Sequence, residues 1–126
     1  MPCLIIINGP IGSGKSTLAM ELGRQARSIG RSAAVIDLDL VYDMLDHREK
    51  SDAAVWFAAR QTAAVLTDHF YSSGVEVVVL EGSFWDVDGR AAFLETLTTP
   101  LTPYFVTLRV SFDCALQRVE RDPTRG

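Results

Sequence analysis

The chain has 126 residues, 48% of them hydrophobic, and a formal net charge of −4. This length and apolar content predict one domain over residues 1–126 with a hydrophobic core, and they argue against a disordered chain. The acidic balance and the short apolar runs argue against a nucleic-acid partner and a membrane span, and they leave the oligomeric state open.

The predicted elements begin with a buried strand, because residues 3–8 form a short run of mostly β-branched apolar residues. A helix follows from Gly14 to about Ile29, where apolar residues recur at helical spacing until Gly30 ends the pattern. The segment between them, residues 9–16, reads GPIGSGKS and fits the phosphate-binding P-loop, G-x-x-x-x-G-K-[ST]. The alternative, a glycine-rich turn without a ligand, is disfavoured because the strand and the helix on either side agree with the motif.

The P-loop predicts ATP and Mg²⁺ as cofactors. Its glycines let backbone N–H groups surround phosphate oxygens, and the helix N-terminus favours their negative charge. We expect Lys15 to contact the β- and γ-phosphates, the Ser16 hydroxyl to ligate magnesium and Thr17 to hydrogen-bond a phosphate. The predicted cofactor-binding residues of this segment are Gly9, Gly12, Ser13, Gly14, Lys15, Ser16 and Thr17.

Two aspartates follow the second predicted strand, at 33–37. A short helix is predicted at 40–45, a loop at 47–51 and a long helix from its N-cap Asp52 to Gly74. In an extended backbone Asp37 and Asp39 point the same way, so one could hold magnesium through water while the other accepts a hydroxyl proton. The alternative is a turn in which Asp39 only caps the short helix.

An acidic residue also ends the third predicted strand, at 75–80. Glu81 follows four apolar residues, which is the arrangement that binds magnesium or orients the attacking group in P-loop enzymes. Gly82 would leave room for a substrate beside it. The alternative is a strand-end charge that simply reaches water.

The remaining elements complete an alternating pattern. A helix is predicted at 91–97, a turn between Pro100 and Pro103, a strand at 104–110 and a last helix from about Asp113. Such alternation predicts an α/β fold, with a parallel sheet covered by helices on both faces.

The end of the last helix carries Arg118 and Arg121, which we expect to face the ATP phosphates or the adenine. The alternative for both is a solvated basic surface. Cys3 and Cys114 stand at buried-looking positions, which suggests reduced thiols. Together with an N-terminus that lacks a signal peptide, this predicts a cytoplasmic protein.

These residues resemble those of the P-loop small-molecule kinases, such as shikimate kinase, adenylylsulfate kinase, chloramphenicol phosphotransferase and the zeta-toxin kinases. The resemblance implies a three-layer P-loop NTPase fold, similar to nucleoside-monophosphate kinases. The segment Asp37-Leu38-Asp39 looks like their D-x-D, which implies that Asp37 supports magnesium and Asp39 meets the acceptor hydroxyl. Arg60 is similar in placement to the acceptor-binding arginine of shikimate kinase; the alternative is an exposed helix arginine.

The chain departs from that pattern in two places. Shikimate kinase has a glycine triplet where this chain has EGSFW at 81–85, so shikimate itself is disfavoured as the acceptor. Phe84 and Trp85 would line the acceptor pocket, with core packing as the alternative, above all for Phe84. The chain also stops where these families enter a lid, so we expect the C-terminal part of the domain to be missing.

The sequence therefore predicts an ATP-dependent kinase that transfers the γ-phosphoryl group to a hydroxyl of a small molecule. Lys15, Asp39 and Glu81 are the predicted catalytic residues, and Ser16 and Asp37 the predicted metal ligands. The predicted substrate-binding residues are Asp39, Arg60, Gly82, Phe84 and Trp85. The alternatives are an NTPase, in which Glu81 orients water, and a nucleotide-binding regulatory module. The D-x-D favours the kinase.

Overall fold

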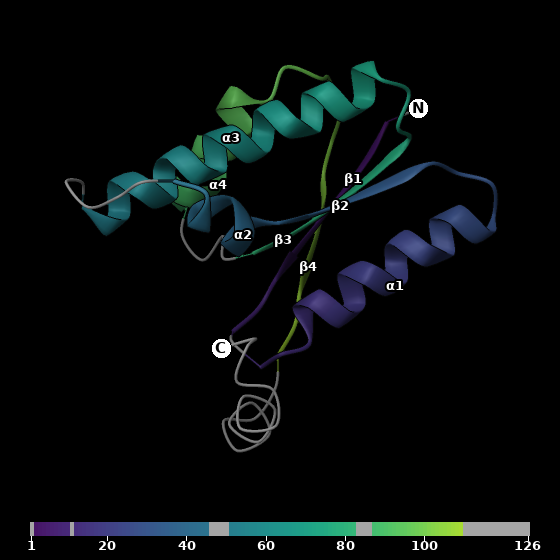
Figure 1. The fold of residues 1–126 in the computed structure, drawn as a ribbon, viewed down its shortest axis with the longest axis horizontal. Coiled ribbons are helices and arrows are strands. Elements are labelled where there is room, and N and C mark those ends of the chain that lie inside the picture. Colours follow the sequence, from purple (N-terminus) through teal and green to yellow (C-terminus); the bar gives the residue numbers. More distant parts are fainter. Residues whose placement is uncertain (1, 11, 46–50, 83–86, 110–126) are drawn as a thin grey trace.

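The structure, a computed structural model, describes residues 2–10, 12–45, 51–82 and 87–109. Within these ranges strands and helices alternate as the sequence predicts (Figure 1). The elements are β1 (Cys3–Asn8), α1 (Lys15–Ser28), β2 (Ala33–Asp37), α2 (Leu38–Asp43), α3 (Asp52–Ser72), β3 (Val77–Gly82), α4 (Val87–Thr96) and β4 (Tyr104–Thr107). Among these helices, none combines the length and apolar character that a membrane crossing requires.

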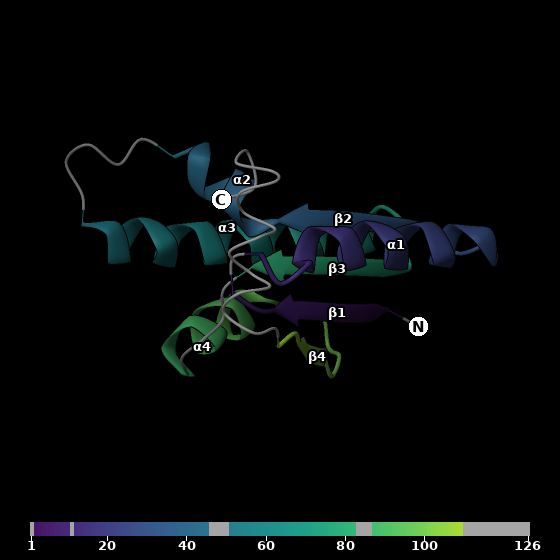
Figure 2. The same cartoon turned by 90° about the horizontal axis from the view of Figure 1, so that it is seen from below.

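The four strands form one parallel sheet in the order β2-β3-β1-β4. Figure 2 shows this order from the side on which α1 lies, and Figure 1 shows α3 and α4 on the opposite side. Every residue of β3 is buried, as expected for a central strand covered on both faces. Because all strands run the same way, their carboxyl ends meet at one edge of the sheet, where ligands bind in folds of this kind.

Each face of the sheet has its own hydrophobic core. The core under α3 and α4 contains Leu4, Ile6, Leu38, Leu80 and Phe93, all of which are fully buried. The core under α1 contains Ile7, Ala19 and Val79. The alternation of residues along β1 and β3 between these two cores follows from the period of two in a strand.

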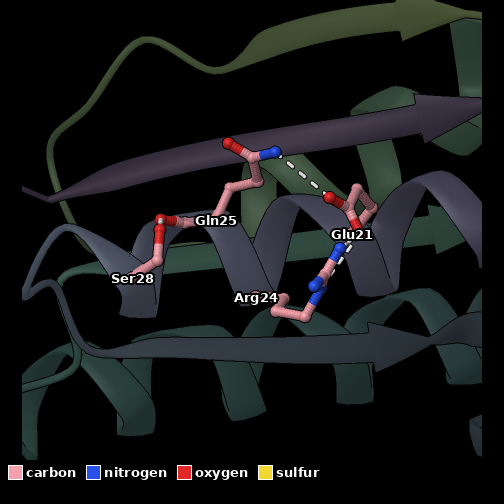
Figure 3. A network of polar contacts seen from close by, with 4 residues as sticks. All are labelled: Glu21, Arg24, Gln25 and Ser28. Atoms are coloured by element: carbon pink, nitrogen blue, oxygen red, sulfur yellow. Dashed lines mark hydrogen bonds and ion pairs between the residues drawn. The ribbon is translucent and has the colours of Figure 1, made fainter.

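Helix α1 illustrates how the sequence chooses the buried face. Its solvent side carries an ion pair between Arg24 and Glu21, and the Gln25 Nε2 donates to Glu21 Oε1 at 3.1 Å (Figure 3). These pairs lie three and four residues apart, the spacing that brings side chains together on one helix face. The opposite side buries Ala19 and Gly23 against the sheet.

The glycines predicted to stop α1 and α3 do so. Gly30 and Gly74 have φ of 82° and 98°, the left-handed conformation that closes a helix with least strain on glycine. After Gly74, the N–H of Val75 still donates to the Phe70 carbonyl oxygen at 2.9 Å. Val75 thus belongs to the helix end, and β3 begins at Val77 rather than at 75.

Three further boundaries differ from the sequence prediction. The N-cap of α3 is Ser51, whose Oγ accepts from the Ala54 N–H at 3.2 Å, and not Asp52. Helix α4 begins at Val87, four residues before the predicted start at 91. Strand β4 ends at Thr107, within the predicted 104–110. The predicted last helix, with Cys114, lies outside the described residues.

Candidate active site

The P-loop occupies the turn between β1 and α1, as predicted. Gly12 and Gly14 have φ of 79° and 92°, values that side-chain-bearing residues rarely adopt. Gly14 is the N-cap of α1, where no side chain caps the helix and no acidic residue stands in the first turn. The first N–H groups of the helix therefore lack a competing local carboxylate, which suits a phosphate.

The cradle is tightly packed at its first position, Gly9. A Cβ added at Gly9 would lie 2.6 Å from Ser13 Oγ and 3.2 Å from Leu108 Cβ. Leu108 also donates its N–H to the Asn8 carbonyl oxygen at 2.7 Å. Leu108, which no sequence motif indicated, thus supports the P-loop from the segment after β4.

Glu81 stands at the end of β3 and contacts the P-loop directly. Ser16 Oγ donates to Glu81 Oε1 at 2.8 Å, and the Glu81 residue is only 3% exposed. The sequence alternative, a strand-end charge that reaches water, is therefore wrong. The hydroxyl and the carboxylate that were predicted separately, 65 residues apart, form one pair.

Lys15 lies over its own loop. Its Nζ donates to the Pro10 carbonyl oxygen at 3.3 Å. Its positive charge also acts on the Asp39 carboxylate and opposes the increase in the pKa of Asp39 described below. The P-loop lysine therefore favours the ionised form of the second aspartate of the D-x-D.

The two aspartates have different local roles. Asp37 is the N-cap of α2, because its Oδ1 accepts from the Asp39 N–H at 2.9 Å. The alternative in which Asp39 caps this helix is wrong, since α2 begins at Leu38 and not at 40. Asp39 is an exposed residue in the first turn of α2, and Asp37 caps the N-terminus of this helix.

The charge around Asp39 is dominated by carboxylates. Partial loss of hydration raises the pKa of Asp39, and the nearby charges of Asp37 and Asp43 raise it further. The Lys15 ammonium acts in the opposite direction. In the sheet register Asp37 pairs with Glu81, so these two residues lie side by side on neighbouring strands.

These oxygen donors fit magnesium, which prefers one or two carboxylates together with phosphate oxygens and water. Ser16, Asp37 and Glu81 are the candidates at this edge of the sheet. Among the described residues, no group of three His, Cys, Asp or Glu side chains gathers closely enough to hold a metal by itself. A site completed by nucleotide phosphates does not require such a group.

Arg60 belongs to a cluster that joins α2 to α3. Its guanidinium carbon lies 5.9 Å from the centroid of the Trp56 ring, and Trp56 stacks on Tyr42 at 4.1 Å between ring centroids. The Tyr42 hydroxyl in turn donates a hydrogen bond to Asp52. Arg60 is half-buried, so the simple alternative of an exposed helix arginine is wrong.

The space beside Gly82 is occupied by the protein itself. Gly82 is buried, and Leu38 lies where its side chain would be. The prediction that Gly82 leaves room for a substrate beside it is therefore wrong at the position of the missing side chain, which Leu38 fills, and the structure gives Gly82 a packing role. Phe84, Trp85, Arg118 and Arg121 lie outside the described residues.

A family comparison agrees with this geometry. The model of a family described as an AAA domain matches residues 4–121, which is most of the chain. The chain therefore belongs to this family, which is one of P-loop kinases. No match was found among curated proteins.

Solved kinase structures share the fold. An unliganded sugar kinase from Janibacter sp. HTCC2649 gives a TM-score of 0.70 at 17% identity, over 96% of this chain and 68% of that chain. The APS kinase of Mycobacterium tuberculosis, in complex with AMPPNP and APS, gives a TM-score of 0.68 at 20% identity, over 98% of this chain and 71% of that chain. The predicted α/β P-loop kinase-like fold is thereby confirmed.

Proposed function

We propose that this protein is an ATP-dependent phosphotransferase that transfers the γ-phosphoryl group to a hydroxyl of a small molecule. The observation that carries the proposal is the 2.8 Å hydrogen bond from Ser16 Oγ of the P-loop to Glu81 Oε1, together with the sheet register that pairs Glu81 with Asp37 of the D-x-D. This arrangement brings the P-loop and the D-x-D to the same edge of the sheet, where Asp39 could accept a hydroxyl proton from an acceptor of the transferred phosphate. The kinase fold of the family supports the same conclusion.

In the proposed reaction the P-loop N–H groups and Lys15 hold the β- and γ-phosphates in place. The acceptor oxygen forms a bond to the γ-phosphorus, the bond from that phosphorus to the β–γ bridging oxygen breaks, and ADP leaves. Asp39 orients the acceptor hydroxyl and receives its proton. When bound, Mg²⁺ neutralises phosphate charge, and Ser16, Asp37 and Glu81 are the residues that would hold it.

The acceptor site extends, in this proposal, from Asp39 toward Arg60, with Phe84 and Trp85 beside it. Arg118 and Arg121 would contact ATP. The acceptor is a small hydroxylated molecule, and because a sugar kinase and an APS kinase share the fold, monosaccharides and APS are the acceptors to test first. A cytoplasmic location likewise stays a prediction.

The experiment is an ATP turnover assay with and without candidate acceptors. We would incubate the protein with Mg·ATP and monosaccharides, nucleosides or APS, and detect ADP together with the phosphorylated product by mass spectrometry. The proposal predicts that one acceptor stimulates ADP formation and gains one phosphoryl group, while Lys15→Ala abolishes both. Hydrolysis that no acceptor stimulates would favour an NTPase, and binding of Mg·ATP without turnover would favour a regulatory module.

A further inference from the structure

We propose that Leu38 is a positioning residue for phosphoryl transfer, and that its packing on Gly82 sets the place of Asp39 beside the P-loop. The inference rests on the proposed function, because it assigns a role within the same site. It concerns a residue that touches neither phosphate nor acceptor.

The contact between Leu38 and Gly82 is closer than any side chain at position 82 would allow. A Cβ added at Gly82 would lie 2.6 Å from Leu38 Cβ and 2.9 Å from Leu38 Cδ2, and real Cβ atoms essentially never come within 3.0 Å of such neighbours. Rotation of the leucine side chain could move Cδ2, but Cβ is fixed to the backbone. Any side chain at position 82 would therefore push the backbones of Leu38 and of position 82 apart.

The backbone conformation does not itself require glycine at this position. The glycines with positive φ among the described residues are Gly12, Gly14, Gly30 and Gly74, so Gly82 has a conformation open to other residues. The close approach of Leu38, which is fully buried, is the feature that demands a glycine here.

The contact lies between the carboxylates of the site. Leu38 separates Asp37, which caps α2, from Asp39, and Gly82 follows Glu81, which accepts the Ser16 hydroxyl. Packing of Leu38 on Gly82 therefore ties the start of α2 to the end of β3. A shift of the Leu38 backbone would carry Asp39 away from the P-loop, and in-line transfer is sensitive to displacements of ~1 Å.

The test compares Gly82→Ala with Gly23→Ala in acceptor-dependent turnover. Gly23 is the matched control, because it is also buried and an added Cβ would lie 2.8 Å from Val35 Cγ2, a contact that involves neither α2 nor the end of β3. We expect Gly82→Ala to lower kcat by ~10- to 10²-fold with an unchanged KM for ATP, since the P-loop is intact. Gly23→Ala should keep both constants. Wild-type kcat in Gly82→Ala, or equal losses in the two variants, would overturn the proposal.

Variants of Leu38 test the contact from its other side, even if Gly82→Ala folds poorly. Leu38→Ala should lower kcat without changing the KM for ATP, and Leu38→Met, which keeps a long apolar side chain, should retain most of the wild-type kcat. The double variant Gly82→Ala/Leu38→Gly should have a higher kcat than the product of the effects of Gly82→Ala and Leu38→Gly alone, because removal of the Leu38 Cβ leaves room for the new Cβ at position 82. Independent effects would contradict the assignment.

A structural readout separates this inference from the proposed function. The Asp39 N–H, which donates to Asp37 Oδ1, gives an NMR amide resonance that can be followed without any acceptor. It should move in Gly82→Ala and stay in place in Gly23→Ala. If the wild type phosphorylates no acceptor, the proposed function fails while this resonance still tests the packing. An unmoved resonance in Gly82→Ala would overturn the positioning role.

Discussion

Glu81 is a buried carboxylate, 3% exposed, and its Oε1 accepts a hydrogen bond from the Ser16 hydroxyl of the P-loop. A buried carboxylate loses hydration, which lowers stability unless hydrogen bonds replace the water. A core residue of similar size would avoid that loss. The buried charge of Glu81 therefore costs stability, and we expect it to serve the function of the site.

Replacement of this charge by an amide tests that view. Glu81→Gln keeps an oxygen that can accept from Ser16, so the melting temperature should be equal to or higher than that of the wild type. Acceptor-dependent turnover should fall by about 10²-fold, because the site loses a carboxylate that would hold the Mg²⁺ bound with the phosphates. Calorimetry and the turnover assay measure the two effects, with Glu95→Gln on the exposed side of α4 as the control. A loss of stability without a loss of turnover would assign Glu81 a structural role.

Lys15, in contrast to Glu81, should contribute little to the stability of the folded state. Its Nζ donates a 3.3 Å hydrogen bond to the Pro10 carbonyl oxygen, and its charge acts on the Asp39 carboxylate. Lys15→Ala should leave the melting temperature close to that of the wild type and greatly weaken the binding of Mg·ATP. Isothermal titration calorimetry measures the affinity, and Arg24→Ala on the solvent side of α1 is the control. Unchanged affinity in Lys15→Ala would remove the P-loop assignment.

At the scale of elements, the sequence predicts each helix and strand from local signals. The apolar runs mark β1 and β3, and glycines mark the ends of α1 and α3. The start of α2 is the instructive error. Asp37 and Asp39 are equally good N-caps by residue type, and the burial of Leu38 against Gly82 decides in favour of Asp37. That contact spans 44 residues of sequence, so local patterns do not reveal it.

The hydrogen bonds that join α3 to the segment before β4 predict how the stability of the protein depends on pH. Asp68 accepts the N–H groups of Thr98 and Thr99, each at 2.9 Å, and the Thr99 hydroxyl at 2.6 Å. Burial acts to raise the pKa of Asp68, but these hydrogen bonds outweigh it and hold the pKa below its usual value of 3.8. A carboxyl with a lowered pKa in the folded state stabilises the protein above its unfolded pKa and loses this effect as the pH falls through the folded value.

Asp68→Asn should therefore melt at a lower temperature than the wild type at about pH 7, and the difference should shrink as the pH falls below about 4. Thermal melts followed by circular dichroism across this range measure it. Glu95→Gln, at an exposed position of α4, controls for the general effect of removing a negative charge. A difference from the wild type that stays constant with pH would mean that the ionised carboxylate is not what stabilises this connection.

At the scale of the whole molecule, the parallel sheet brings the functional groups together. The P-loop follows β1, the D-x-D follows β2 and Glu81 ends β3, so three distant segments meet at one edge. The sequence predicts this meeting because alternating strands and helices imply a parallel sheet. The sequence could not predict the burial of Glu81, the packing of Leu38 on Gly82 or the packing of Leu108 on Gly9. Each of these depends on contacts between distant segments.

The central claim, that Asp39 serves phosphoryl transfer to an acceptor, is tested most directly by the turnover of Asp39→Asn. The control is Asp43→Asn, which removes a charge from the same short helix. With the acceptor that stimulates the wild type, Asp39→Asn should bind Mg·ATP normally and lose ~10²–10⁴ in rate. The lower end is expected because a loose transition state needs little help from a base. Asp43→Asn should keep its rate. Wild-type turnover in Asp39→Asn would contradict the claim.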